Sequence, residues 1–233
     1  MELKAILFDV FGTVVDWRTS LIDELSAWGR DRVPGADWTG LVDDWRAAYA
    51  PSMARVRRGE LAWTPLDALH RQTLDEIAPR YGVVGLTPSE MDWVNRGWHR
   101  LRPWPDSVPG LTRLKRRYLL SPLSNGNVAL LVNMAKQAGL PWDLVLCAEI
   151  FRHYKPDAEV YLGACSLLGL LPGQVMLCAA HNSDLAAAQA LGLQTAFIPR
   201  PLEYGPLQVR DFDAEGQWDV VAADLTALAD RLA

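Results

Sequence analysis

The pattern of hydrophobic and polar positions changes near the middle of this chain. After about residue 108, short apolar runs alternate with longer segments in which apolar residues recur at helical spacing. The runs are 119–123, 144–148, 175–179 and 195–198, and the helical segments between them are 128–138, 158–168 and 184–191. Strands that alternate with helices of these lengths predict a parallel sheet with right-handed crossover connections.

The start of the chain adds one more strand to this sheet. The apolar run at 3–8 ends at Asp9, and a turn containing Gly12 follows directly. A short buried strand that delivers a carboxylate onto a glycine turn is the layout by which open α/β sheets present a reactive group at a strand's carboxyl end. Asp9 is therefore a candidate nucleophile. Its alternative role is to cap the turn that follows.

The segment 17–104 has a different pattern. No comparable strand appears in it, and helical spacing recurs at 21–28, 41–56 and 66–78. Eight of the ten Trp residues lie here, which indicates either an aromatic cover over a pocket or ordinary packing between helices. We interpret the segment as a helical insert that covers the edge of the sheet.

The predicted fold is therefore α/β. An open parallel, Rossmann-like sheet forms a core domain from 1–16 and 105–233, and 17–104 forms an inserted helical cap subdomain. A chain of 233 residues with 50% hydrophobic and 22% charged residues is long enough for one core and such an insert.

Charge and composition limit the partners and the compartment. The net charge is −5, and no long run of Lys or Arg occurs, so we expect no nucleic acid and no membrane partner but a small-molecule substrate. No apolar segment approaches the about 20 residues that span a bilayer, and the first residues do not resemble a secretory signal, so we expect a cytoplasmic protein. The three Cys residues lack CxxC spacing and are expected to pack in the core.

Polar residues follow several of the predicted strands, at the point where each strand ends. In chain order they are Asp9 with Thr13, Ser124 with Asn125, Lys155, and the segment from His181 to Asp184. Each has a simple structural explanation when taken alone, as a turn, a solvated side chain or a helix cap. Together and in this order they are specific for a catalytic site.

This ordered set resembles the haloacid dehalogenase superfamily, whose four motifs are a nucleophilic Asp, a Ser or Thr, a Lys and a closing acidic segment. The resemblance covers the whole chain, including the helical cap after the first motif. The phosphatases of that superfamily carry a second Asp two residues after the nucleophile, as a general acid, and an additional acidic residue in the fourth motif. Here Phe11 stands at the first position, and Asp184 is the only acid in the segment CAAHNSD.

Phe11 cannot transfer a proton, and a Mg²⁺ ion would lack oxygen ligands here. The form D-x-F-G-T instead resembles the L-2-haloacid dehalogenase branch, which needs no metal. The resemblance therefore implies a hydrolase that acts on carbon–halide bonds, with no metal and no cofactor. It also implies that Arg46, in the cap segment DDWRAAY, holds the halide and the substrate, and that Tyr161 lies near the active site.

The mechanism that the resemblance implies begins with attack of the Asp9 carboxylate on C2 of a short 2-haloalkanoic acid. This step releases halide and leaves an aspartyl ester, which water then hydrolyses to a 2-hydroxy acid. Lys155 is expected to keep Asp9 ionised, and Thr13 and Ser124 to donate hydrogen bonds. The backbone N–H groups of Val10 and Phe11 can bind the substrate carboxylate as an anion nest.

We expect Asp184, with His181, to activate the hydrolytic water. His181 stands where the branch usually has an Asn, and Ala179 stands where it usually has a Ser. An imidazole can accept a proton or donate a charged hydrogen bond, so the role of His181 stays open. The segments WHRLRPWPD, LSNGN, HYKPD and CAAHN also resemble bacterial members of this branch that are associated with defluorination.

A tight pocket that contains Arg46, Asn125, His181 and an indole N–H, such as that of Trp98, would favour fluoride, the strongest hydrogen-bond acceptor among the halides. Fluoroacetate is therefore a candidate substrate beside (S)-2-haloacids and haloacetates. Two alternatives stay open. One is a Mg²⁺-dependent phosphatase of the same superfamily, and the other is a catalytically idle member that binds a carboxylate. Relatives in this branch are often dimers, which makes a homodimer an option.

Overall fold

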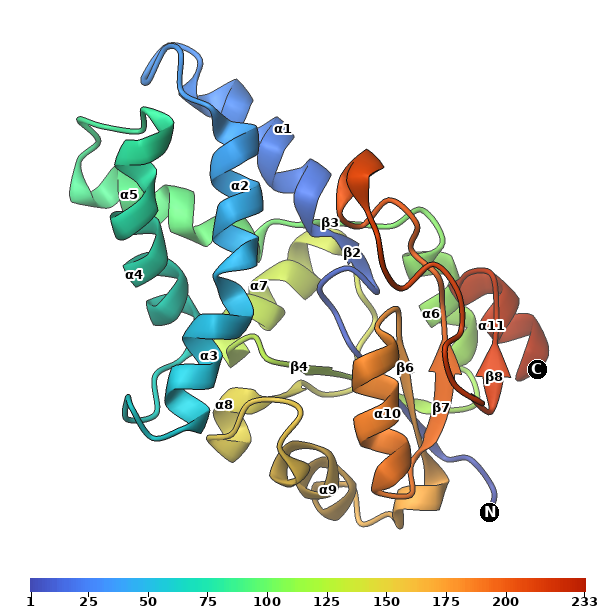
Figure 1. Ribbon diagram of the computed structural model, residues 1–233. Coiled ribbons are helices and arrows are strands. Elements are labelled where there is room, and N and C mark those ends of the chain that lie inside the picture. Colours follow the sequence, from blue (N-terminus) through green and yellow to red (C-terminus); the bar gives the residue numbers. More distant parts are fainter.

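In the computed structural model, which describes residues 1–233 apart from the side chain of Leu207, six strands form one parallel sheet (Figure 1). Their order across the sheet is β5-β4-β1-β6-β7-β8. The strands are β1 (Ala5–Phe8), β4 (Leu119–Ser124), β5 (Leu146–Cys147), β6 (Val175–Ala179), β7 (Gln194–Phe197) and β8 (Val220–Val221). The predicted parallel sheet is confirmed, and β8 is a short additional strand at its edge.

Strand β1 lies inside the sheet and is buried on both faces. Ile6 and Phe8 belong to one apolar cluster, and Ala5 and Leu7 belong to the other. Successive side chains of a strand point to opposite faces, so a strand that helices cover on both sides needs apolar residues at every position. The unbroken apolar run before Asp9 is therefore the pattern of a central strand.

Helices of the core pack against both faces of the sheet. Buried residues of α6 (Ser107–Leu114), α7 (Val128–Ala138) and α11 (Leu225–Arg231) join the cluster that contains Ile6. Buried residues of α9 (Ala158–Leu167) and α10 (Asn182–Ala190) join the cluster that contains Leu7. The short helix α8 (Ala148–Phe151) connects β5 toward α9, and the 3₁₀ turns η3 (Pro172–Gln174) and η4 (Gly205–Leu207) complete this part.

The remaining helices come from one continuous segment. They are α1 (Trp17–Gly29), α2 (Trp38–Ala47), α3 (Tyr49–Arg57), α4 (Leu66–Ile77) and α5 (Pro88–Asn95), with the 3₁₀ turns η1 (Ala78–Tyr81) and η2 (Arg96–His99). Figure 1 shows them, in blue to green, gathered beside the sheet. The strand β2 (Val15–Asp16) enters this segment and pairs antiparallel with β3 (Arg102–Pro103), which leaves it. The division into a core and a cap domain at 16/17 and 104/105 stays a prediction.

The predicted helical segment 41–56 is divided into two helices. Helix α2 ends at Ala47, and α3 begins at Tyr49, with Ala48 as the junction. Pro51 explains the break, because proline has no N–H to donate and its ring clashes with the carbonyl four residues earlier. The proline is accepted in the first turn of α3, where no N–H donor is needed. The junction brings Arg46 and Tyr49 together near the edge of the sheet.

Within the described part of the chain, no helix combines the length and the apolar character that crossing a membrane requires.

Candidate active site

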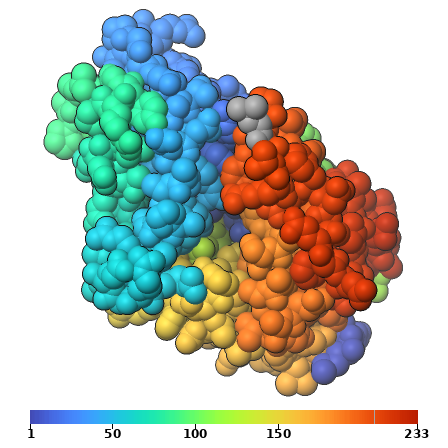
Figure 2. All heavy atoms as spheres, in the orientation of Figure 1, coloured from blue at the N-terminus to red at the C-terminus, as the bar shows by residue number. Residues whose placement is uncertain are grey.

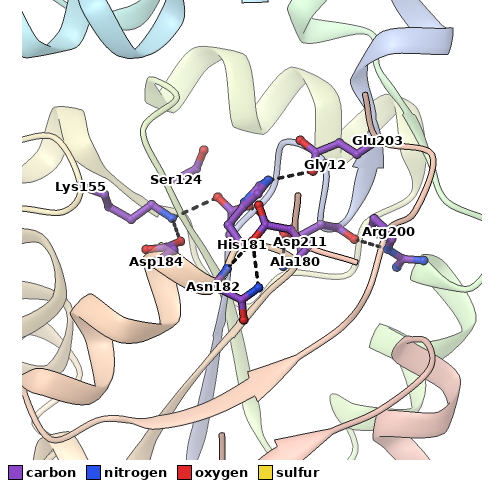
Figure 3. Close-up of polar contacts among 12 residues, drawn as sticks. Gly12, Ser124, Lys155, Ala180, His181, Asn182, Asp184, Arg200, Glu203 and Asp211 are labelled. Carbon is purple, nitrogen blue, oxygen red and sulfur yellow. Dashed lines mark hydrogen bonds and ion pairs between the residues drawn. The ribbon is translucent and has the colours of Figure 1, made fainter. Parts of the chain in front are cut away.

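The polar residues that follow the strands meet at one edge of the sheet. Asp9 directly follows β1, Ser124 ends β4, and His181 lies two residues after β6. These three strands are neighbours in the sheet, and the carboxyl ends of parallel strands meet at the same edge. Lys155, in the connection between α8 and α9, also reaches this edge (Figure 3).

A cavity of about 660 Å³ lies between this edge and the helices of the insert. Asp9, Lys155 and His181 line it from the sheet side, and Arg46 and Tyr49 line it from the helices. Figure 2 shows the hollow between the blue helices of the insert and the orange C-terminal part of the chain. The cavity is large enough for a small organic acid, and charged groups of both signs surround it.

Three donors hold the Asp9 carboxylate, which is buried. Lys155 Nζ donates to Oδ1 at 3.0 Å, Thr13 Oγ1 donates to Oδ2 at 2.8 Å, and His181 Nδ1 lies 3.1 Å from Oδ2. Burial alone raises the pKa of Asp9, but the charge of Lys155 and the hydrogen bonds from His181 and Thr13 outweigh it, so the pKa lies far below its ordinary value. Asp9 is therefore an ionised, oriented carboxylate at the cavity wall.

Lys155 also contacts a second carboxylate. Its Nζ donates to Asp184 Oδ2, and Tyr161 Oη donates to Asp184 Oδ1 at 2.6 Å. Burial lowers the pKa of Lys155, but the charges of Asp184 and Asp9 raise it more, so the side chain stays an ammonium ion. The ammonium therefore links the two carboxylates, and Figure 3 shows its contact with Asp184.

His181 lies between two carboxylates. Its Nδ1 faces Asp9, and its Nε2 lies 2.8 Å from Oε2 of Glu203, a residue that is 1% exposed (Figure 3). Burial lowers the pKa of His181, but Glu203 and Asp9 raise it well above its ordinary value of 6.5. Because carboxylates only accept hydrogen bonds, both ring nitrogens must carry a proton here, and the side chain is an imidazolium.

Arg46, in the last turn of α2, reaches this site from the insert. Its guanidinium lies over the ring of Tyr49 at 4.3 Å and over that of Trp17 at 5.2 Å, and its Nη2 is 3.7 Å from Glu203 Oε1. Its Nη1 is buried and has no hydrogen-bond partner among the described residues. A buried donor without a partner favours binding of an anion from the cavity.

The structure brings most of the predicted site residues together, but not all. Asn125 lines the cavity, and its Oδ1 accepts a hydrogen bond from the N–H of Lys155 at 2.7 Å. Ser124 lies at the same edge, where its Oγ accepts a hydrogen bond from the N–H of Gly126. Trp98 is fully buried behind Phe11, edge to face with it at 5.7 Å, so its indole does not reach the cavity wall.

Val10 is also buried, and its carbonyl accepts from the N–H of Val14, which shapes the turn after Asp9. The side chain of Phe11 lines the cavity beside Tyr49. This aromatic wall occupies the place where a phosphatase of this fold has its general acid.

Sequence reasoning missed Glu203 as a site residue. The loop from Ile198 onward reads as a proline-rich connection, and nothing in its pattern indicates that it returns to the strand edge. The side chain is held by the indole Nε1 of Trp17, which donates to Oε1 at 3.0 Å, as well as by His181. Burial raises the pKa of the Glu203 carboxyl group, but His181 and Arg46 lower it by more. The pKa therefore lies below its ordinary value, and the group is ionised.

The phosphatases of this fold hold a metal ion at this edge, and the residues present do not fit one. The ammonium of Lys155 lies between Asp9 and Asp184, the two carboxylates that would have to share a cation. Among the described residues, no group of three or more His, Cys, Asp or Glu side chains has the arrangement of a metal site. The remaining acid, Glu203, is engaged by His181. We therefore derive no step that uses a metal ion.

Comparison with known proteins agrees with this geometry. A family model described as a haloacid dehalogenase-like hydrolase matches residues 3–192. The chain therefore belongs to this family of hydrolases.

Among solved structures, the chain is similar to the L-2-haloacid dehalogenase PA0810, with 55% identity, a TM-score of 0.95 and coverage of 99% of this chain and 100% of that one. It is also similar to the defluorinating L-2-haloacid dehalogenase Rha0230, with 48% identity, a TM-score of 0.96 and coverage of 99% and 95%. A curated relative is (S)-2-haloacid dehalogenase 4A of Burkholderia cepacia, 28% identical over 98% of this chain and 99% of the relative.

Proposed function

We propose that this protein hydrolyses short (S)-2-haloalkanoic acids and haloacetates to 2-hydroxy acids, through an ester on Asp9 and without a metal ion. The observation that carries the proposal is the buried, ionised Asp9 carboxylate, which three donors orient at a cavity whose opposite wall carries Arg46. Phe11 beside it supplies no proton for phosphoryl transfer. The 55% identical relative described as an L-2-haloacid dehalogenase supports the same substrate class.

The first step forms a bond from an Asp9 oxygen to C2 and breaks the carbon–halogen bond, whose electron pair leaves with the halide. Arg46 Nη1 is the donor that receives an anion, either the substrate carboxylate or the halide. In the second step, water adds to the Asp9 carboxyl carbon, and Asp184 accepts the proton of that water. Because Asp184 is fixed by Lys155 and Tyr161, it is oriented for this role before the ester forms.

Fluoroacetate belongs to the proposed substrate range. Fluoride is a poor leaving group that needs strong hydrogen-bond donors, and the guanidinium of Arg46, whose Nη1 has no partner among the described residues, is a charged donor of this cavity. The 48% identical relative described as defluorinating supports this part of the proposal. We further propose that the protein works in the cytoplasm on a small-molecule substrate, and a homodimer stays a prediction.

The test is halide release from chloroacetate, fluoroacetate and the two enantiomers of 2-chloropropanoate, followed with an ion-selective electrode in EDTA. We expect release from chloroacetate and from the S enantiomer, and fluoride from fluoroacetate. Asp9→Asn removes the nucleophile and should abolish all release, whereas Asp31→Asn, at an exposed position, should leave it unchanged. Magnesium-dependent hydrolysis of p-nitrophenyl phosphate without halide release would favour the phosphatase. Binding of a haloacid with neither activity would favour the idle member.

A further inference from the structure

The contact between His181 and Glu203 has no counterpart in the motifs that define the site. Glu203 lies in the loop after β7, and its carboxylate reaches His181 Nε2 at 2.8 Å. The position is narrow: a Cβ at Gly12 would lie 2.2 Å from the Glu203 carboxyl group. The Glu203 carboxylate therefore fits only because residue 12 is a glycine and has no side chain.

Charged groups approach His181 from every element around it. Asp9 and Glu203 contact the ring directly. The cavity wall carries six further charged residues, the cations Arg46, Lys155 and Arg210 and the carboxylates Asp43, Asp184 and Asp211. The cations oppose a charge on the ring, and the carboxylates favour it. In the resting site, Asp9 and Glu203 together keep both ring nitrogens protonated.

The two oxygens of Asp9 are not equivalent. Oδ2 accepts from Thr13 Oγ1 and faces His181 Nδ1, whereas Oδ1 accepts from Lys155 Nζ. Thr13 Oγ1 itself accepts from the N–H of Ala180 at 2.9 Å, which directs the hydroxyl proton toward Asp9. Two donors occupy the lone pairs of Oδ2, so Oδ1 is the oxygen free to attack C2. Oδ2 then becomes the carbonyl oxygen of the ester.

We propose that His181, as an imidazolium, and Thr13 form the oxyanion hole for hydrolysis of the Asp9 ester, and that Glu203 is the positioning residue that keeps His181 charged during that step. This inference rests on the proposed function. When water adds to the Asp9 carboxyl carbon, the negative charge develops on Oδ2, where both donors already point. The proton of the water goes to Asp184. Cleavage of the bond between that carbon and Oδ1 leaves Asp9 as a carboxylic acid, and the departing alkoxide takes the proton from Asp184 to give the 2-hydroxy acid. Asp9, whose pKa lies far below its ordinary value, then releases its own proton to solvent, which restores the carboxylate.

Glu203 is needed because the ester removes a charge. As soon as Asp9 is alkylated, it no longer carries a negative charge, and His181 keeps only one carboxylate partner. Lys155 and Arg46 would then drive a proton from the ring if Glu203 were neutral. Loss of the Glu203 charge should therefore slow hydrolysis of the ester much more than its formation.

The first test measures His181 itself and does not depend on turnover. The chain contains four His residues, so the ¹⁵N signals of His181 can be assigned by their loss in His181→Asn. We expect the imidazolium form in the wild type at pH 7, and a titration midpoint that falls by about 1 pH unit or more in Glu203→Gln. Glu76→Gln, at an exposed position on α4, removes the same charge elsewhere and should leave the titration midpoint of His181 unchanged. A neutral His181 in the wild type at pH 7, or an equal midpoint in Glu203→Gln, would overturn the proposal.

The second test separates the two chemical steps by rapid quench with (S)-2-chloropropanoate. In Glu203→Gln we expect a first burst of halide at close to the wild-type rate, an ester on Asp9 detected by mass, and steady turnover lower by about 10²-fold. The steady rate of Glu203→Gln should also decrease as the pH rises, and this decrease should begin at a lower pH than in the wild type. Equal loss of burst and steady turnover, with no ester, would contradict the assigned role.

A double-mutant cycle identifies the route of the effect. If Glu203 acts through His181, Glu203→Gln should add almost nothing in the His181→Asn background, where steady turnover is already slow. Additive losses would show that Glu203 acts by another route. If the wild type releases no halide from any haloacid, the proposed function fails, and the titration of His181 still decides whether Glu203 keeps the ring charged.

Discussion

At the scale of single residues, the site depends on charges that balance within one buried volume. Three carboxylates lie among three cations, and each charge has an opposite neighbour within contact distance or nearly so. They are Asp9, Asp184 and Glu203 on one side, and Lys155, His181 and Arg46 on the other. Burying a charge is costly unless it is paired, so removal of one member leaves its partner uncompensated. Single substitutions here should act on neighbours as well as on the residue changed.

Gly12 provides a test of the space that Glu203 needs. Its φ of +86° is in the left-handed region, and an added Cβ would overlap the Glu203 carboxyl group. Gly12→Ala should therefore destabilise the protein in urea unfolding by more than the about 1–2 kcal/mol that left-handed backbone alone costs. Gly139→Ala is the matched control, because its φ is +69° and nothing lies near the added Cβ. Equal losses in the two variants would show that Glu203 is not held by this contact.

Arg46 provides a test of anion binding from the insert. Loss of a charge-assisted hydrogen bond costs about 1.5–3 kcal/mol, so Arg46→Ala should lower kcat/KM for every 2-haloacid by about 10- to 100-fold. Arg32→Ala is the control: Arg32 also lies over an indole, that of Trp28, at 4.8 Å, but it is remote from the cavity. Unchanged kinetics in Arg46→Ala would remove the residue from the binding site.

At the scale of elements, a polar network joins the insert to the core. Asp67, at the start of α4, accepts hydrogen bonds from Asn127 Nδ2 at 2.9 Å and lies 3.0 Å from His99 Nε2. Asn133 of α7 reaches the other nitrogen of the same ring at 3.0 Å. Burial raises the pKa of Asp67, but His99 and Asn127 lower it below its ordinary value of 3.8. This network fixes α4 and η2 against α7.

Asp67→Asn should therefore destabilise the protein by about 1–3 kcal/mol at pH 7, because buried hydrogen bonds lose a charged acceptor. The pH dependence follows from the lowered pKa of Asp67. The difference in unfolding free energy between the variant and the wild type is fully present above pH 3.8, and it decreases as the pH falls through the pKa of Asp67 in the folded state. Asp75→Asn, on the same helix in an exposed pair with Arg71, should change stability by less than about 0.5 kcal/mol. Urea unfolding at pH 7 and at pH 3 or below measures both variants.

At the scale of the whole molecule, stability in acid should depend on one buried histidine. Neither ring nitrogen of His70 has a hydrogen-bond partner among the described residues, and the ring lies against Trp98 at 4.5 Å. Burial lowers its pKa to about 3, so the folded protein holds it neutral. The unfolded chain takes up a proton near 6.5, so the contribution of His70 is fully present above pH 6.5 and decreases as the pH falls, by up to about 1.4 kcal/mol per pH unit.

His70→Phe should remove this slope and stabilise the protein at neutral pH, because an aromatic ring without unpaired polar atoms replaces the imidazole. Trp45 still donates to the carbonyl of residue 70, which the substitution does not change. Replacement of the partly exposed His153 by Gln should keep the wild-type slope. Thermal unfolding between pH 4 and 7 compares the variants, and an unchanged slope in His70→Phe would contradict the assignment.

The order of the strand-end motifs made much of the sheet and the site predictable. Central strands need apolar runs, so β1 and β6 were visible in the sequence as unbroken runs and β4 as a run that Ser121 interrupts, and Asp9 follows from where β1 ends. The edge strand β8 was not visible, because two partly exposed valines carry no pattern. The predicted role of Trp98 at the cavity also failed to match its position, because indole burial behind Phe11 depends on how the helices pack.

The sequence by itself determined which residues stand at the carboxyl ends of the strands, since alternation and apolar runs are local properties of the chain. Tertiary structure alone decided that Glu203 meets His181 and that Arg46 meets Glu203, because these contacts join a loop, a helix cap and an inserted helix. No local pattern of residues encodes such a contact, because it depends on the long-range packing of the insert and the final loop against the sheet. The charge of His181 is set there, by a neighbour 22 residues away along the chain.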